Sequence, residues 1–449
     1  MTEMHKTSWL YKFLRTYTNF IYGSWYSSTE VNNDRVIPKH SSVIFAPNHQ
    51  NAFVDAMALL WASPEPIVFL AKASIFTRKF IKKALNGLKI MPAYRMRDGY
   101  ANLKKNEESF NEAVNVLAHN EYFCLMPEGG QDEKRRLRPL VKGMFRIAFA
   151  AQKLKPEGES VLIIPTGIDY GHYDHSGFHL VINYGKPIRI ADYYAEYLEN
   201  EAVTQNKVRD ELYNRMKALI LHISSEKYYD TFYAATYIYN SEMLDAKGWS
   251  ENESNRLAVR QKIAAALDKA EAEENPLLPE LDKKVKQWLS NVEDDMVELY
   301  SVANEYPHSM DFALIYNILY LLISLLVVIP AFVLSGLPRL LFQVVARKLA
   351  YGTGFEGSLK LGFVYVLLPL FYLIEILLFI ALRPPYVHIE NEGIWVLLAF
   401  IVSLPLSFLI LQNFSRRFRI VKARLKTIFK MGKIADEIKE IMRKIVPEI

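Results

Sequence analysis

The sequence is almost free of cysteine and lacks several common catalytic and metal-binding patterns. Cys124 is the only cysteine among 449 residues, which excludes a disulfide framework and a thiolate metal site. No Gly-x-Ser-x-Gly segment occurs, so the nucleophile turn of lipases and esterases is missing. His172, His175 and His179 lie close together in the chain, but no carboxylate–histidine spacing of a zinc site accompanies them. We therefore expect neither a metal nor a covalent serine mechanism.

The chain also has little net charge, and its basic residues are unevenly placed. The formal charge of +5 is too small to indicate a nucleic acid partner. After Leu411, however, eleven Lys and Arg residues stand against four Asp and Glu. A basic tail behind an apolar segment is typical of contact with anionic lipid head groups. Residues 8–26 are aromatic but interrupted by Lys12 and Arg15, and no small-residue cleavage site follows, so we predict no cleavable signal peptide.

Apolar and charged residues, 51% and 23% of the chain, are segregated along it. Near the N-terminus Leu10, Phe13, Tyr17 and Phe20 recur at helical spacing. That pattern fits a helix at a membrane surface, or equally a first helix packed on the domain core. The segregation predicts an interfacial amphipathic helix at 1–30, an α/β domain at 31–192, a helical subdomain at 193–307, a membrane region at 308–411 and a basic amphipathic tail at 412–449.

Short apolar runs alternate with helical patterns between residues 41 and 190. The runs SVIFAP, PIVFLA, YFCLMP, VLIIPTGIDY and FHLVINYG are typical of strands, and residues near 53–62, 76–86, 100–119 and 142–154 are typical of helices. Because the strand runs are continuously apolar, we expect a sheet covered on both faces. The predicted fold class is α/β, a sheet flanked by helices, followed by a helical subdomain and C-terminal transmembrane helices.

Three segments are apolar enough to enter a bilayer: Phe312–Leu337, Gly362–Leu382 and Ile394–Leu411. The loop 338–361 and the tail are both basic, which places them together on the cytoplasmic side. Three complete crossings would then leave the N-terminal domain outside. We therefore predict that Phe312–Leu337 bends near Pro330 and leaves on the side it entered, while the other two segments span.

A polar group follows the first long strand run. SVIFAP leads into Asn48-His49, and Asp55 comes six positions after His49, at the start of a helical pattern. Histidine is the side chain best placed to take a proton near neutral pH, and a carboxylate beside it fixes its tautomer. Six helical residues turn a side chain by about 600°, so His49 has to lie in the turn before the helix. Taken alone, the pattern could equally be a helix N-cap.

Further motifs follow in order along the chain. GLKIMPAYR ends in Arg95, Met126-Pro127-Glu128-Gly129 precedes Lys142-Gly143, and IIPTG contains Pro165. With the Asn48-His49 to Asp55 segment, these four blocks resemble the glycerolipid acyltransferase superfamily, which includes lysophosphatidate and glycerol-3-phosphate acyltransferases. The apolar C-terminal third resembles a membrane-anchored branch of that superfamily.

The resemblance implies a reaction and a set of site residues. His49 would act as the general base on an acceptor hydroxyl that attacks an acyl thioester, and Asp55 would orient it. Acyl-CoA or an acyl carrier protein would be the donor, and no other cofactor is implied. Substrate-binding roles fall on Asn48, Arg95, Glu128, Gly129, Lys142 and Pro165. Arg95 is the first candidate to bind the phosphate of the acceptor, since a guanidinium group forms bidentate hydrogen bonds with phosphate.

Two departures from the family pattern bear on the substrate. Five residues separate His49 from Asp55 where four are usual, as in a fungal branch acting on glycerol phosphate and dihydroxyacetone phosphate. Gly129 is followed by Gly130-Gln131 where a hydroxyl residue is usual. We expect transfer to glycerol 3-phosphate or lysophosphatidate at a bacterial cytoplasmic membrane, catalytic domain facing the cytoplasm. There are two alternatives. The acceptor could be an acylated amino-acid lipid, or the protein could be a lipid-binding scaffold without catalytic activity.

Overall fold

The computed structural model describes residues 4, 7–76, 78–93, 103–292, 299, 312–351, 353–382 and 392–446. It separates into two compact units. The first unit comprises Met1–Gly23, Thr29–Asp169 and Leu180–Leu221, and the second comprises Ser24–Ser28, Tyr170–His179 and His222–Ile449. Each unit has its own organisation.

A mixed sheet forms the centre of the first unit. In the described part of the chain it has eight strands in the order β1-β7-β6-β2-β5-β3-β4, with β8 also pairing with β6. The pairs β2–β5, β2–β6, β3–β4 and β3–β5 are parallel. The strands are β1 (Ser28–Asn32), β2 (Val43–Pro47), β3 (Ile67–Lys72), β4 (Ile90–Ala93), β5 (Tyr122–Cys124), β6 (Leu162–Tyr170), β7 (His179–Tyr184) and β8 (Ile188–Arg189). The predicted α/β fold class is confirmed, and the unpredicted strands β1 and β8 are short and carry no apolar run.

Helices cover this sheet because their apolar residues recur every three to four positions. Phe145 and Phe149 in α5, and Leu212 and Met216 in α7, share one buried cluster with strand residues such as Ile163. The first unit therefore runs on to Leu221, past the expected domain boundary at 192. Its helices are α1 (Trp9–Trp25), α2 (Ala52–Ala62), α3 (Lys79–Gly87), α4 (Leu103–Ala118), α5 (Gly143–Gln152), α6 (Tyr194–Glu199) and α7 (Glu201–Lys217).

Helix α1 buries one face and exposes the other. Tyr22 is fully buried, and its hydroxyl donates to the Val54 carbonyl at 3.2 Å. Trp9 and Phe13 are 78% and 58% exposed, and their rings stack with centroids 6.0 Å apart. The helix thus packs on the domain and still presents an aromatic stripe. Contact of that stripe with lipid stays a prediction.

The polar part of the second unit is helical. It contains α8 (Tyr229–Ile238), α9 (Asn240–Ala246), α10 (Glu253–Ala272), α11 (Leu278–Leu289) and α16 (Gly432–Ile445). Helix α16 buries Ile438 and Met442, and ion pairs Lys284–Glu437 and Arg443–Glu242 fasten it to α11 and α9. Protein already covers the apolar face of α16. The predicted contact of the tail with lipid head groups can therefore involve only the basic residues that precede α16.

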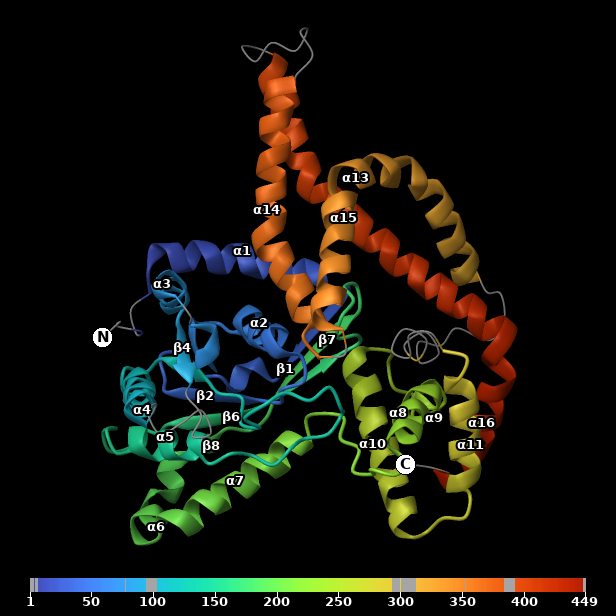
Figure 1. Cartoon of the computed structure of the whole chain (residues 1–449). Helices are drawn as coiled ribbons and strands as arrows, with labels where there is room; N and C mark the ends of the chain where they lie inside the picture. The colour runs from blue at the N-terminus through green and yellow to red at the C-terminus, as the bar shows by residue number, and fades with distance from the viewer. Residues whose placement is uncertain are drawn as a thin grey trace. The chain divides into compact units, whose positions relative to one another are not determined.

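The described residues include three helices long and apolar enough to cross a membrane. They are α13 (Phe312–Ala350), α14 (Glu356–Leu382) and α15 (Glu392–Lys426). Apolar side chains on them face outward, among them Leu326 and Val333, which are 81% and 75% exposed. Helix α13 runs on well beyond the expected end at Leu337, contains Pro330 and Pro338, and is bent in Figure 1.

Candidate active site

Three neighbouring strands bring the polar residues of the site together. The chain passes from β2 into His49, from β5 into Glu128, and β6 carries Asp169 near its end. Since β2 pairs in parallel with both β5 and β6, these strands end on the same side of the sheet. The carboxyl edge of a parallel sheet is the usual place for a binding crevice. The strands of the first, third and fourth predicted blocks are therefore neighbours in the sheet.

His49 and Asp55 form a close pair. The imidazole Nδ1 lies 2.9 Å from Asp55 Oδ2. The same oxygen accepts hydrogen bonds from the backbone N–H groups of Gln50 at 3.0 Å and Asn51 at 2.8 Å. Asp55 is fully buried, whereas the His49 side chain keeps 19% of its surface exposed. A carboxylate accepting from Nδ1–H leaves the lone pair on Nε2, the nitrogen that can take a proton from a substrate.

The turn before α2 does not serve as an ordinary helix cap. Asn51 is the N-cap residue, yet its side chain makes no capping hydrogen bond. Ala52, the first residue of α2, has a φ of 43°. This left-handed conformation is energetically unfavourable for alanine. The buried carboxylate of Asp55, which follows this strained residue in the chain, accepts the hydrogen bonds of the backbone N–H groups in the turn instead. The turn is therefore built around the His49–Asp55 pair.

Asn48 fixes the start of the turn against β6. Its side-chain amide donates to the Ile168 carbonyl at 3.0 Å and accepts from the Ile168 N–H at 2.7 Å. It is 1% exposed and also donates to Gln50 Oε1 at 3.2 Å. These contacts continue the pairing of β2 with β6 beyond Pro47 and hold His49 at the end of the strand.

Glu128 links the His49 turn to the loop that follows β5. Its Oε1 accepts from the His49 N–H at 2.8 Å, and its Oε2 accepts from the Arg138 N–H at 3.0 Å. Burial raises the pKa of Glu128 to about 7, although the two backbone hydrogen bonds oppose the shift. Next to it Gly129 has φ of +68°, and an added Cβ would lie 3.0 Å from the Val141 side chain. This position therefore favours glycine.

The raised pKa of Glu128 predicts a pH-dependent stability. Below its unfolded pKa of 4.5 the carboxyl is protonated in both states; between pH 4.5 and about 7 the folded protein holds the proton more tightly. The contribution of Glu128 to stability therefore falls as pH rises through that window. Thermal unfolding of the detergent-purified protein is measured at pH 5 and pH 8. The stability of the wild type relative to Glu128→Gln should be higher at pH 5 than at pH 8. An advantage that is constant, or larger at pH 8, contradicts the assignment.

A buried ion pair supports the same loop from β6. Arg135 Nη1 lies 2.7 Å from Asp169 Oδ1, and both side chains are 2% exposed. Gln50 Nε2 donates to the Lys134 carbonyl at 2.9 Å, and the Asp132 N–H donates to the His49 carbonyl at 3.2 Å. Lys134, Arg135, Arg136 and Arg138 follow one another closely in the sequence, and within this basic run Arg135 is thus a structural residue. The sequence analysis did not predict Asp169 as a site residue, although an acidic residue near the end of the apolar strand run VLIIPTGIDY could have indicated it.

The remaining predicted residues lie in different settings. Lys142 is exposed at the N-cap of α5. Pro165 is buried opposite Ala46 in β6, and its carbonyl accepts from the Gly185 N–H at 2.8 Å. Arg95 lies outside the described residues, two positions after the end of β4. The pKa of the Cys124 thiol is raised by burial, so this cysteine stays protonated and is no nucleophile.

The histidines after β6 make protein contacts. His172 Nδ1 accepts from the backbone N–H groups of Asp174 at 2.9 Å and His175 at 3.1 Å. His179 Nδ1 lies 3.1 Å from the Glu253 carboxylate. Among the residues that the structure describes, no group of three or more His, Cys, Asp or Glu side chains is placed to hold a metal ion.

Comparisons with known proteins find similarity to acyltransferases in this part of the chain. The family model described as Acyltransferase matches residues 28–169. Glycerol-3-phosphate O-acyltransferase 1 of Saccharomyces cerevisiae is 29% identical over 110 residues, which are 24% of this chain and 14% of the yeast protein. Glycerol-3-phosphate O-acyltransferase 2 of the same yeast is 27% identical over 118 residues, 26% of this chain and 16% of that protein. The chain thus spans about a sixth of the length of these relatives.

A solved structure matches part of the chain. The crystal structure of the 1-acyl-sn-glycerophosphate acyltransferase PlsC from Thermotoga maritima shares 17% sequence identity, with a TM-score of 0.35. The similarity covers 46% of this chain and 80% of that one.

Proposed function

We propose that residues 28–169, which match the Acyltransferase family model, form an acyltransferase domain of the glycerolipid type that moves a fatty acyl group from a thioester to a glycerol-type hydroxyl. The observation that carries the proposal is the His49–Asp55 pair, with Nδ1 and Oδ2 2.9 Å apart at the carboxyl edge of the sheet. A scaffold without activity has no need of a buried carboxylate aimed at a half-buried imidazole.

The geometry supports direct transfer. His49 Nε2 takes the proton of the acceptor hydroxyl while the oxygen of that hydroxyl attacks the carbonyl carbon of the thioester. The ester C–O bond forms, the C–S bond breaks, and the imidazolium returns the proton to the leaving thiolate. Asp55 stabilises the imidazolium and keeps the proton-bearing Nδ1 turned inward. A thioester is already activated, so no covalent enzyme intermediate is needed.

We place a phosphate-bearing acceptor, glycerol 3-phosphate or lysophosphatidate, at this site. Arg95 is the proposed phosphate ligand, with the exposed Lys142 as the second cation. Replacing Arg95 with alanine should raise KM for a phosphate acceptor at least about tenfold, because a charge-assisted hydrogen bond is lost, and should change kcat less. Steady-state kinetics with glycerol 3-phosphate checks this. Equal effects on phosphorylated and uncharged acceptors would remove Arg95 from that role.

A transfer assay tests the function itself. Labelled acyl-CoA or acyl carrier protein is offered to the detergent-purified protein with glycerol 3-phosphate, lysophosphatidate and an acylated amino acid in parallel. Transfer to a phosphate acceptor, lost in His49→Ala, supports the proposal. Transfer only to the acylated amino acid keeps the mechanism and changes the acceptor, an outcome to which Gly130-Gln131 gives room. No transfer to any acceptor contradicts the proposal.

We also propose that the chain is an integral membrane protein of a bacterial cytoplasmic membrane, with the catalytic domain on the cytoplasmic side. Three apolar helices and the bend of α13 support a re-entrant first helix and two spanning ones. Cys124 is buried, so single cysteines introduced at His119, Tyr351 and His388 can be labelled selectively in sealed vesicles. His119 and Tyr351 should react from the same side and His388 from the other. Reaction of Tyr351 from the side opposite to His119 rules out a re-entrant α13.

A further inference from the structure

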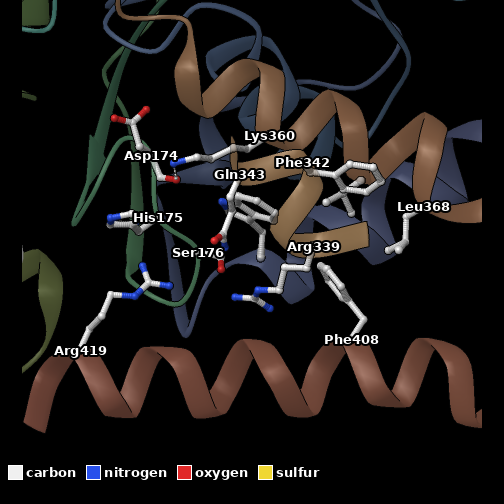
Figure 2. Close-up of a pocket in the computed structure, with 12 residues that line it drawn as sticks. Asp174, His175, Ser176, Arg339, Phe342, Gln343, Lys360, Leu368, Phe408 and Arg419 are labelled. Carbon is white, nitrogen blue, oxygen red and sulfur yellow. Dashed lines mark hydrogen bonds between the residues drawn. The ribbon is translucent and has the colours of Figure 1, made fainter. Parts of the chain in front are cut away.

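A cavity lies inside the second unit, and none of the residues of the proposed catalytic site lines it. Its walls come from Trp25, the segment Tyr170–His179, and helices α13, α14 and α15. Figure 2 shows its polar side chains toward one end and apolar ones, among them Leu368 and Phe408, toward the other. Basic pockets between membrane helices are a known way to hold lipid head groups.

Specific contacts hold the walls of this cavity together. The Trp25 carbonyl accepts from the Gly177 N–H at 2.7 Å and from Gln412 Nε2 on α15 at 3.1 Å. Gly177 packs so closely on α15 that an added Cβ would lie 2.9 Å from the Arg416 side chain. Lys360 on α14 donates to the Asp174 carbonyl at 3.3 Å. The segment Tyr170–His179 is therefore fastened to both helices, and the cavity has a defined shape.

The basic side chains around the cavity differ in their surroundings. Lys360 is 8% exposed and has a carboxylate partner, Glu356, at 2.6 Å. Arg339 on α13 lies over the Phe408 ring at 5.9 Å, and in the described part of the chain no carboxylate lies within ion-pair distance of it. Figure 2 shows the guanidinium groups of Arg339 and Arg419 pointing toward the same space from α13 and α15. Two like charges that point into the same space repel unless an anion lies between them.

The apolar end suits an amphipathic anion rather than a small ion. Phe342 and Phe408 are 5% and 7% exposed and line this end. On the outer surface of α13, Leu340 and Leu341 are each 48% exposed. Arginines within membrane helices are costly and usually mark a site that meets a ligand. A ligand with a phosphate at one end and acyl chains at the other satisfies both ends of the cavity.

We propose that this cavity binds an anionic phospholipid, whose phosphate lies between Arg339 and Arg419 and whose acyl chains follow α13 and α14. Guanidinium groups hold phosphate through charge-assisted hydrogen bonds, which explains two arginines facing one space. The site stands independently of the proposed acyl transfer, because none of its residues belongs to the catalytic pair and binding needs no turnover.

Native mass spectrometry of the full-length, detergent-purified protein tests the site. The protein is titrated with phosphatidylglycerol, with phosphatidylcholine of the same acyl chains, and with inorganic phosphate. Arg339→Gln and Arg419→Gln should each weaken phosphatidylglycerol binding about tenfold or more. Phosphatidylcholine, whose choline cation offsets the charge of its own phosphate, should bind the wild type more weakly and lose less in these variants. Arg347→Gln is the matched control, since Arg347 lies on α13, is exposed and does not line the cavity.

The inference is overturned if Arg339→Gln binds phosphatidylglycerol as the wild type does, or if Arg347→Gln loses as much. Equal affinity for both lipids, or binding of inorganic phosphate that lipid does not displace, overturns it as well. Should a glutamine variant fail to fold, Arg339→Lys keeps the charge and should bind more weakly than wild type. Independently, phosphatidylglycerol should raise the thermal midpoint of the wild type more than phosphatidylcholine does, and an equal rise contradicts the site.

Discussion

Replacing His49 with alanine is expected to lower kcat for acyl transfer by about 10²–10⁴-fold, because a positioned general base contributes that much. KM for both substrates should change little, since the base acts on the proton only as the transition state forms. Asp55→Asn should also lower kcat, because Oδ2 takes three hydrogen bonds, from His49 Nδ1 and from two backbone N–H groups. Initial rates with a labelled acyl donor, at saturating acceptor, measure both effects.

His119→Ala is the matched control for this experiment. His119 belongs to the same unit, is exposed directly after α4, and is not one of the residues of the site. This variant should keep wild-type activity. If His49→Ala retained a tenth or more of the wild-type kcat, His49 would not be the base, and a different proton acceptor would have to be found.

Breaking the buried pair of Arg135 and Asp169 is expected to cost about 3–5 kcal/mol of folding free energy, because it leaves one charge buried without its partner. The atoms lie 2.7 Å apart and both side chains are 2% exposed, so water cannot replace the missing group. Arg135→Met and Asp169→Leu should each show this loss. The double variant Arg135→Met/Asp169→Leu should lose less than either single one, because no charge remains buried. Denaturant unfolding followed by tryptophan fluorescence measures the differences.

The exposed pair Lys207–Glu196 provides the comparison. Its atoms lie 2.8 Å apart, much like those of the buried pair, but its side chains are 54% and 52% exposed. Lys207→Met should therefore cost no more than about 1 kcal/mol. Similar losses for Lys207→Met and Arg135→Met, or a double variant as unstable as the sum of the single ones, would falsify the assigned role of burial.

Much of the fold followed from residue patterns. Continuously apolar runs such as SVIFAP and FHLVINYG predicted β2 and β7 within two residues, and the helical pattern near 100–119 predicted α4. Strand β1, with the sequence STEVN, gave no such signal, because an edge strand buries too little to need an apolar run. The expected boundary at 192 and the unit boundary at Leu221 differ because α7 buries Leu212 and Met216 in the same core as the sheet.

The sequence by itself determined the chemistry: which residues can take a proton or bind phosphate, their order along the chain, and the apolar helices long enough for a membrane. Those properties reside in side-chain types and their spacing. Only the tertiary structure decided which residues meet. It brought Glu128 to the backbone of His49, buried Arg135 against Asp169, and turned Arg339 toward Arg419. The first two of these contacts join residues 79 and 34 positions apart in the chain, and the order of the strands in the sheet fixes them. No local pattern in the chain records that geometry.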